Sequence, residues 1–174
     1  MKGKDFLNGV AHSRRDIVAE LLAMLEETGA AYCVIGGLAV NAYAEPVVSL
    51  DLDLVVAADR MEALRLAAAA RGMKVQQFEH SVNLTLAASD LRIQLQTDRR
   101  YQEFIGRAER REVLGYDLSV ASLADVLRGK LWAYADKTRR ASKRQKDLAD
   151  IMRLVETHPE LKRQLPPDIA GQFD

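Results

Sequence analysis

Two strand-like segments lie close together in the first third of the chain, and their order restricts the fold more than any other feature. The first, residues 31–35, is a short apolar run that ends at the glycine pair Gly36 and Gly37. The second, residues 50–56, alternates leucine and aspartate, as a strand with one polar face does. This order predicts a strand, a glycine turn with a short helix, and a second strand that carries two carboxylates.

The glycine pair and the acidic pair each suit one part of a nucleoside triphosphate. Glycines where a strand meets a helix let backbone N–H groups approach an anion. Residues i and i+2 of a strand point to the same face, so we expect Asp51 and Asp53 to project together, with Cβ atoms roughly 6 to 7 Å apart. A divalent cation such as Mg2+ or Mn2+ could bridge them, because it prefers oxygen ligands. Ser49 shares that face and could donate to a phosphate oxygen.

The composition allows a substantial core and gives no strong overall charge. Apolar residues make up 48% of the 174 residues, and 25 basic residues balance 25 acidic ones. A single cysteine, Cys33, excludes a disulfide framework and Cys/His zinc spacings. No apolar run approaches the roughly 18 residues of a membrane span, and the first residues lack a signal-peptide pattern. We therefore expect a cytoplasmic protein with no membrane contact.

The remaining patterns predict an α+β fold with a small mixed sheet and flanking helices. Helical periodicity covers residues 13–28, 38–43 and 61–71, with Ser13 as the cap of the first helix. Strand patterns follow at 75–78, 82–87 and 91–97, and a strand pair around Gly115 is one interpretation of 113–120. Two helices are predicted after that, one capped by Ser122 and one opened by a capping box at Ser142, before a loose proline-containing tail. We expect a catalytic sheet over residues 1–115 and a helical part over 116–174 packed on it.

The glycine pair is followed after thirteen residues by Asp51-Leu52-Asp53, and this arrangement resembles the signature of the nucleotidyltransferase superfamily with the DNA polymerase β-like fold. The small members that it is most similar to are AbiEii-type abortive-infection toxins and related minimal nucleotidyltransferases. Segments 127–131 and 143–151 are similar to the paired helices that follow the catalytic sheet in those families, so the resemblance covers about residues 15–160.

The resemblance implies metal-dependent transfer of a nucleoside monophosphate from a nucleoside triphosphate, with release of pyrophosphate. The acceptor would be a hydroxyl of tRNA, of another RNA or of a protein, and the protein would act as a toxin-antitoxin component with an antitoxin partner. Asp51 and Asp53 would be the catalytic metal ligands, and the nucleotide would be bound by Gly36, Gly37, Ser49, Lys130, Lys146 and Asp147.

A cluster of basic residues lies just before Asp147 in the sequence. It consists of Lys137, Arg139, Arg140, Lys143, Arg144 and Lys146. The cluster could clamp a triphosphate or an RNA backbone, or it could be a solvated helix start with an ordinary i,i+4 pair between Lys146 and Asp150.

Two features depart from the family pattern. Many relatives have a basic residue ahead of the first aspartate, where this chain has Val47 and Val48. The family carries a third carboxylate on a neighbouring strand, whereas residues 91–97 offer Gln94 and Gln96, with Asp98 just beyond. Glutamine can ligate a metal through its carbonyl oxygen but cannot act as a base. Three hypotheses therefore stay open: an active transferase, a catalytically degenerate module that binds nucleotide or protein, and a small α+β domain whose acidic strand has no function.

Overall fold

The protein is built on a seven-stranded mixed sheet in the computed structural model, which describes residues 3–173. The strand order is β3-β4-β5-β2-β1-β7-β6. β2 runs parallel to β5 and β1 runs parallel to β7, while the other neighbouring pairs are antiparallel. The strands are β1 Tyr32–Ile35, β2 Asp51–Val56, β3 Lys74–Gln77, β4 Ser81–Thr85, β5 Arg92–Gln96, β6 Glu109–Val113 and β7 Tyr116–Val120. This mixed sheet with its flanking helices confirms the predicted fold class.

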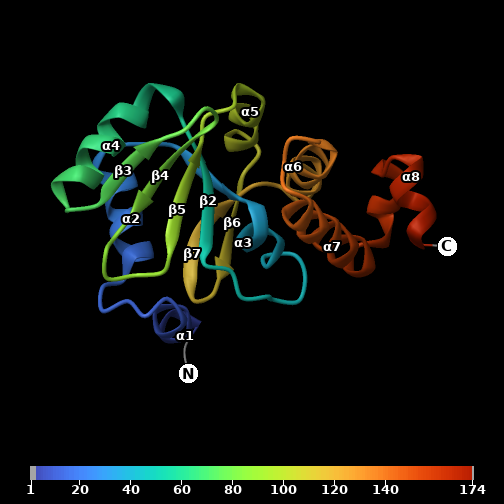
Figure 1. Ribbon diagram of the computed structural model, residues 1–174, viewed down its shortest axis with the longest axis horizontal. Helices are drawn as coiled ribbons and strands as arrows, with labels where there is room; N and C mark the ends of the chain where they lie inside the picture. Colours follow the sequence, from blue (N-terminus) through green and yellow to red (C-terminus); the bar gives the residue numbers. More distant parts are fainter. Residues whose placement is uncertain (1–2, 174) are drawn as a thin grey trace.

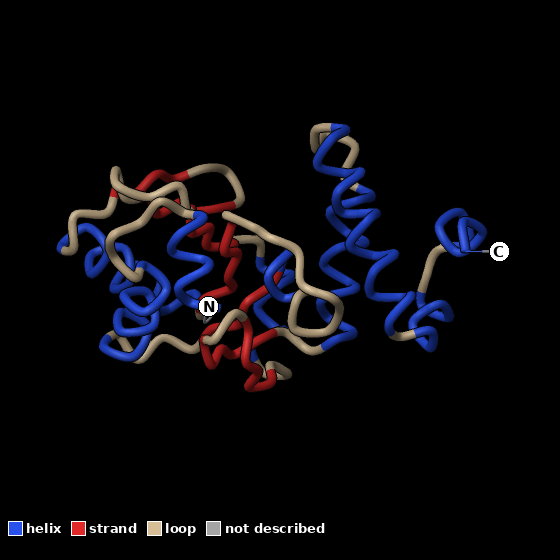
Figure 2. Tube along the Cα trace, turned by 90° about the horizontal axis from the view of Figure 1, so that it is seen from below, coloured by secondary structure: helices blue, strands red, loops and turns tan. Residues whose placement is uncertain are grey.

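Helices cover the sheet and form the C-terminal part of the chain. Figure 1 shows α2 and α4 beside the β3–β4 end of the sheet and α6, α7 and α8 together on the opposite side of the molecule. Seen from below in Figure 2, the C-terminal helices extend away from the strands. The α-helices are α1 Gly3–Val10, α2 Ile17–Glu27, α3 Gly36–Val40, α4 Met61–Ala70, α5 Gln102–Ile105, α6 Leu123–Ala135, α7 Ala141–Thr157 and α8 Pro167–Ala170.

The alternation of β2 and β5 separates the core from the polar face of the sheet. Leu52 and Leu54 pair in register with Ile93 and Leu95, and all four side chains are buried in the hydrophobic core. The residues between them are polar and point to the other face, since side chains alternate along a strand. The parallel register places Asp53 beside Gln94 on that polar face.

Two predicted helix caps differ from the observed ones, and a third is confirmed. Ser13 forms a local turn with the backbone of Arg15, so α2 is capped by Asp16, whose Oδ1 accepts a hydrogen bond of 3.0 Å from the N–H of Ala19. α7 begins at Ala141 and has no side-chain cap, so the capping box at Ser142 was wrong. Ser122 caps α6 as predicted.

The C-terminal tail is ordered rather than loose, and the first helix, α1, was not predicted. Residues 159–164 form a 3-10 helix that is followed by α8, and Leu161, Leu165 and Ile169 are buried. Of the prolines that suggested a loose tail, Pro159 and Pro167 occupy the first positions of these helical turns, where a missing N–H costs nothing, and Pro166 is the N-cap residue of α8. At the other end of the chain, α1 buries Leu7.

The sheet continues past the predicted division of the chain at residues 115 and 116. That division falls in the turn between β6 and β7, at Gly115, and β7 pairs with β1 in the middle of the molecule. α6 and α7 pack against each other and against α3. Within residues 3–173 no helix has both the length and the apolar character needed to cross a membrane.

Candidate active site

The turn after β1 brings a glycine into direct contact with the second aspartate. In the antiparallel β1–β2 ladder Ile35 lies opposite Asp53, so the next residue, Gly36, reaches the Asp53 side chain. A Cβ on Gly36 would lie 2.2 Å from Asp53 Oδ2, and the backbone of Gly36 has a φ of +69°. Glycine is therefore required twice here, once by the left-handed backbone and once by the close approach.

The second glycine and Ser49 have different surroundings. A Cβ on Gly37 would lie 3.6 Å from Ser49 Oγ, which is an ordinary contact. Ser49 is buried, and its Oγ exchanges hydrogen bonds of 3.2 and 3.3 Å with the backbone of Asp51. Ser49 thus stabilises a local turn before β2, and its contact with a phosphate oxygen stays a prediction.

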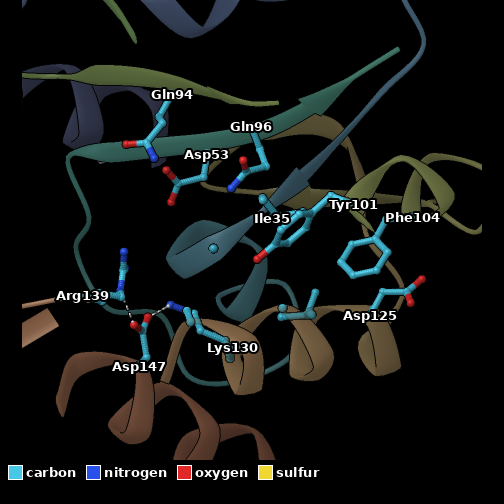
Figure 3. Close-up of a pocket in the computed structure, with 14 residues that line it drawn as sticks. Ile35, Asp53, Gln94, Gln96, Tyr101, Phe104, Asp125, Lys130, Arg139 and Asp147 are labelled. Carbon is cyan, nitrogen blue, oxygen red and sulfur yellow. Dashed lines mark hydrogen bonds and ion pairs between the residues drawn. The ribbon is translucent and has the colours of Figure 1, made fainter. Parts of the chain in front are cut away.

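Asp53 faces a cavity of about 100 Å3 between the sheet and the C-terminal helices. Figure 3 shows Asp53, Gln94 and Gln96 on the strand side, with Lys130, Arg139 and Asp147 facing them from the helical side. The cavity is lined by Ile35, Gly36, Asp53, Gln94, Gln96, Tyr101, Phe104, Asp125, Val126, Gly129, Lys130, Ala133, Arg139 and Asp147. Five predicted site residues, Gly36, Asp53, Gln94, Lys130 and Asp147, are among them.

The carboxylate of Asp53 is poorly solvated and lacks a hydrogen-bond donor among the described residues. Burial raises its pKa from the ordinary 3.8 to about 6, and the charge of Asp51 adds to this rise. The charges of Lys130, Arg139 and Lys146 act in the opposite direction without cancelling it. A carboxylate in this state is stabilised by any cation that approaches it.

Asp51 lies on the same strand face but is already paired. Arg92, its register partner on β5, donates to Asp51 Oδ1 from Nε at 2.9 Å and from Nη2 at 2.7 Å. Lys143 Nζ on α7 lies 3.5 Å from the other oxygen, Oδ2. Burial alone would raise the pKa of Asp51, but the hydrogen bond from Arg92 and the charges of Arg92, Lys143 and Lys146 lower it. Asp51 is therefore ionised at neutral pH.

The helical wall of the cavity holds a buried charge network. Lys130 Nζ lies 3.0 Å from Asp147 Oδ1 and 2.7 Å from Asp150 Oδ2, and the lysine is nearly inaccessible. Arg139 Nε donates to the other oxygen of Asp147 at 2.7 Å. Burial alone would lower the pKa of Lys130, but Asp150 and Asp147 raise it. Lys130 is a charged residue that joins α6 to α7.

Arg153 connects this network to the loop between Gly37 and Asp51. It donates to Asp150 Oδ1 at 2.8 Å, to Asn41 Oδ1 at 3.0 Å and to the backbone oxygen of Glu45. Asn41 in turn exchanges two hydrogen bonds, of 2.7 and 2.9 Å, with the backbone of Val47. The loop that joins the glycine turn to the acidic strand is thus held by the same charges that hold the helices.

The third carboxylate expected from the resemblance is absent from the described part of the site. Gln94 stands beside Asp53 in register, and residues 3–173 contain no cluster of three or more acidic, histidine or cysteine side chains arranged to hold a metal ion. Asp98 lies further along and is paired with Arg100, which donates to it from Nε at 2.9 Å and Nη2 at 2.7 Å.

A larger cavity of about 510 Å3 adjoins the first. The two share Gln94, Gln96, Tyr101, Ala133 and Arg139 in their linings. The Oε1 atom of Gln96 accepts hydrogen bonds of 3.0 Å from the backbone N–H groups of residues 97 and 98, which leaves its amide N–H groups for the cavity. The outer cavity gives a ligand at Asp53 room to extend towards solvent.

The predicted site residues are thus brought to one region, although not all line the cavity. Lys146 is exposed on α7, outside the lining, yet its charge acts on both Asp51 and Asp53. Arg92 was not predicted as a site residue. The alternation of Arg92, Gln94 and Gln96 signals a polar strand face, but the pairing of that face with β2 depends on a register that the sequence does not display.

Comparison with solved structures identifies the architecture. The solution structure of the antibiotic-resistance factor ANT(2'')-Ia matches with a TM-score of 0.62 over 90% of this chain and 89% of that chain, at 14% identity. The lincomycin-bound lincosamide antibiotic adenylyltransferase LnuA matches at 0.56 over 79% and 95%, with 10% identity. An antigenic nucleotidyltransferase-like protein from Paracoccidioides brasiliensis matches at 0.53 over 80% and 74%, with 22% identity.

The chain has the nucleotidyltransferase fold. No protein-family model matches the chain, and no curated protein is significantly similar to it in sequence. The nucleotidyltransferase fold is therefore recognised through its tertiary structure, at 10 to 22% identity to these three solved structures.

The two glycines should respond differently to alanine. Gly36→Ala places a methyl group against Asp53 in a left-handed backbone, which should cost about 1–2 kcal/mol of unfolding free energy and displace the carboxylate. Gly37→Ala, in helical backbone with space beside it, should leave stability within about 0.5 kcal/mol. Urea unfolding measures both, and equal effects of the two changes would contradict the assigned geometry.

The raised pKa of Asp53 predicts a pH-dependent gain from its neutral isostere. The fold favours protonated Asp53, so this contribution to stability is present below the unfolded pKa and is lost as pH rises through about 6. Asp53→Asn should match wild type near pH 4 and exceed it near pH 7.5 by up to about 3 kcal/mol, less where solvent screens the charge. Thermal unfolding across pH tests this, with exposed Asp59→Asn as control. A gain that does not vary with pH would contradict it.

Replacement of the two lysines predicted for the cleft should change the free energy of unfolding by different amounts. Lys130→Met leaves Asp147 and Asp150 buried without their shared cation, which should cost about 3–5 kcal/mol. Lys146→Met changes an exposed residue, so stability should stay within about 0.5 kcal/mol. Chemical denaturation distinguishes them. A Lys130→Met protein as stable as wild type would show that the network does not support the fold.

Proposed function

We propose that this protein is a nucleotidyltransferase, which moves a nucleoside monophosphate from a nucleoside triphosphate to an acceptor hydroxyl and releases pyrophosphate. The observation that carries the proposal is the close approach of Gly36 to the Asp53 carboxylate, at a cavity whose opposite wall carries Lys130 and Arg139 together with Asp147. An unrelated acidic strand would not need a left-handed glycine packed on its second aspartate. The fold shared with ANT(2'')-Ia and LnuA supports the same assignment.

Backbone N–H groups and basic side chains would together bind the triphosphate. Backbone N–H groups at the start of α3 have no partner within the helix and suit phosphate oxygens. Arg139 and Lys130 carry positive charge on the helical side. Half-buried Lys143 lies near Asp51, and the charge of exposed Lys146 acts on both Asp51 and Asp53. Phosphoryl chemistry depends mainly on such positioning and charge neutralisation.

The acidic pair fits a divalent cation. Asp53 has no hydrogen-bond donor among the described residues, and Asp51 keeps Oδ2 free of any contact shorter than the 3.5 Å to Lys143. Gln94 beside Asp53 could add a carbonyl oxygen. When bound there, Mg2+ or Mn2+ would supply neutralisation of the charge on the phosphate oxygens.

The absence of a carboxylate at Gln94 favours a second candidate function. Apart from Asp53, which would hold the cation, the carboxylates that line the inner cavity are Asp125 and Asp147, and both are paired with basic residues rather than free to remove the proton of an acceptor hydroxyl. A catalytically degenerate module that binds nucleotide or a partner protein would keep Gly36, Asp51 and Asp53 and lose only this base. The two candidates therefore predict the same nucleotide binding and differ in turnover.

The acceptor stays a prediction. A hydroxyl of tRNA, another RNA or a protein, a specific likeness to AbiEii-type toxins, and an antitoxin partner all rest on the sequence resemblance. Exposed Lys137 and Arg140 suit the phosphate backbone of RNA. The structure of ANT(2'')-Ia with adenylyl-2''-tobramycin and that of LnuA with lincomycin add small polar molecules to the acceptors worth testing.

The test is transfer of label from radioactive nucleoside triphosphates to total tRNA, to protein and to a panel of aminoglycosides and lincosamides, with Mg2+ or Mn2+. We expect label transfer by wild type, its loss on chelation of the metal, and a decrease of more than about a hundredfold in Asp53→Asn. Asp59→Asn, which changes an exposed carboxylate in the 3-10 turn between β2 and α4, should retain full activity.

Binding measured in parallel separates the two candidates. Nucleotide-dependent thermal stabilisation without any label transfer would support the degenerate module. If the protein shows neither nucleotide-dependent stabilisation nor label transfer, both candidates are excluded. Transfer that persists in Asp53→Asn would place the chemistry elsewhere in the molecule.

A further inference from the structure

The two aspartates of β2 share a face but not an environment, and Arg92 is the reason. In the parallel pairing of β2 with β5, Arg92 lies opposite Asp51 and Gln94 lies opposite Asp53. Asp51 therefore has a cation as its neighbour, and Asp53 has a neutral amide. Two strands thus carry a charge pair and a carboxylate–amide pair side by side.

The contact between Arg92 and Asp51 is aimed at a single oxygen. Both Nε and Nη2 of the guanidinium donate to Oδ1, at 2.9 and 2.7 Å. Oδ2 receives only the longer approach of Lys143. Asp51 is thereby held in one orientation, with one oxygen saturated by charge-assisted hydrogen bonds and one available.

This arrangement conflicts with two ions at the site. Paired metal ions stand about 3.5–4 Å apart and clamp the reacting oxygens from both sides. Such a pair needs carboxylate oxygens on both sides of the shared ligand. Here one side of Asp51 holds a guanidinium, and the neighbouring strand offers the neutral Gln94.

We propose that Arg92 is a positioning residue that limits the site to a single divalent cation, held between Asp51 Oδ2 and Asp53, with the guanidinium supplying one positive charge where a second ion would supply two. This inference rests on the proposed nucleotidyltransferase function. Arg92 acts through Asp51, whose free oxygen it fixes. Its remaining nitrogen, Nη1, has no hydrogen-bond partner in the described part of the chain and is left for a phosphate oxygen.

The test counts Mn2+ ions bound with a non-hydrolysable ATP analogue, by anomalous scattering in crystals and by EPR, which distinguishes isolated ions from a coupled pair. Wild type should bind one isolated Mn2+ per chain, and Asp53→Asn should lose it. Gln94→Asp should still bind one, because Arg92 continues to hold Asp51 Oδ1. The double variant Arg92→Gln with Gln94→Asp should bind two, with the spectrum of a coupled pair.

Two further variants control for charge and for arginine content. Arg92→Lys with Gln94→Asp keeps a cation beside Asp51 and should stay at one Mn2+. Arg110→Gln, which removes the arginine of another cross-strand ion pair, with Asp117, should also stay at one. Circular dichroism melts confirm that each variant is folded before ions are counted.

The outcomes separate the two levels of the proposal. Two coupled Mn2+ ions in wild type or in Gln94→Asp alone would overturn the role of Arg92 and leave the nucleotidyltransferase function standing. A single Mn2+ in the Arg92→Gln, Gln94→Asp protein would overturn it equally. Wild type that binds no Mn2+ even with the ATP analogue would overturn both the inference and the proposed function.

Discussion

The contact between a backbone and a carboxylate, Gly36 against Asp53, is the constraint on which the rest of the site depends. Both positions are set by the β1–β2 ladder, in which Ile35 pairs with Asp53. The same hydrogen bonds that build the sheet therefore place the turn beside the acid. The left-handed φ of Gly36 then directs the chain into α3, away from the carboxylate. A change in the β1–β2 pairing would therefore alter both the sheet and the position of Gly36 relative to Asp53.

The charges around this contact have two separate roles. Lys130, Asp147 and Asp150 are buried and mutually paired, so they hold α6 and α7 in position. Asp53 has no such partner, and its pKa rises to about 6 because burial and Asp51 both oppose its ionisation. The buried network balances its own charges, whereas Asp53 has no basic partner among the described residues. The site therefore keeps an unbalanced negative charge. The cation that this acid lacks is what a metal with its polyphosphate would bring.

The chain shares its fold with solved structures to which it is 10 to 22% identical. The residues that set the charge of its own site lie on the polar face of β2 and β5. Gln94 replaces an expected carboxylate, and Arg92 neutralises Asp51 from the adjacent strand. With an arginine and a glutamine at these two positions, β5 brings no negative charge to the site. Neither residue contacts the glycine turn, so the proposed nucleotide binding and the proposed turnover can be tested separately.

The sequence by itself determined the strand–glycine–strand unit, the acidic pair and the cap of α6, because each follows from local spacing: a period of two, a glycine after an apolar run, a serine before a helix. It did not reveal the ordered C-terminal turns, where Leu161 and Ile169 are fixed by burial rather than by pattern. Nor did it reveal that Arg92 would meet Asp51, 41 residues earlier in the chain. Only the tertiary structure decided that, because strand register is set by packing between distant segments, and it is the register that makes one aspartate paired and the other free.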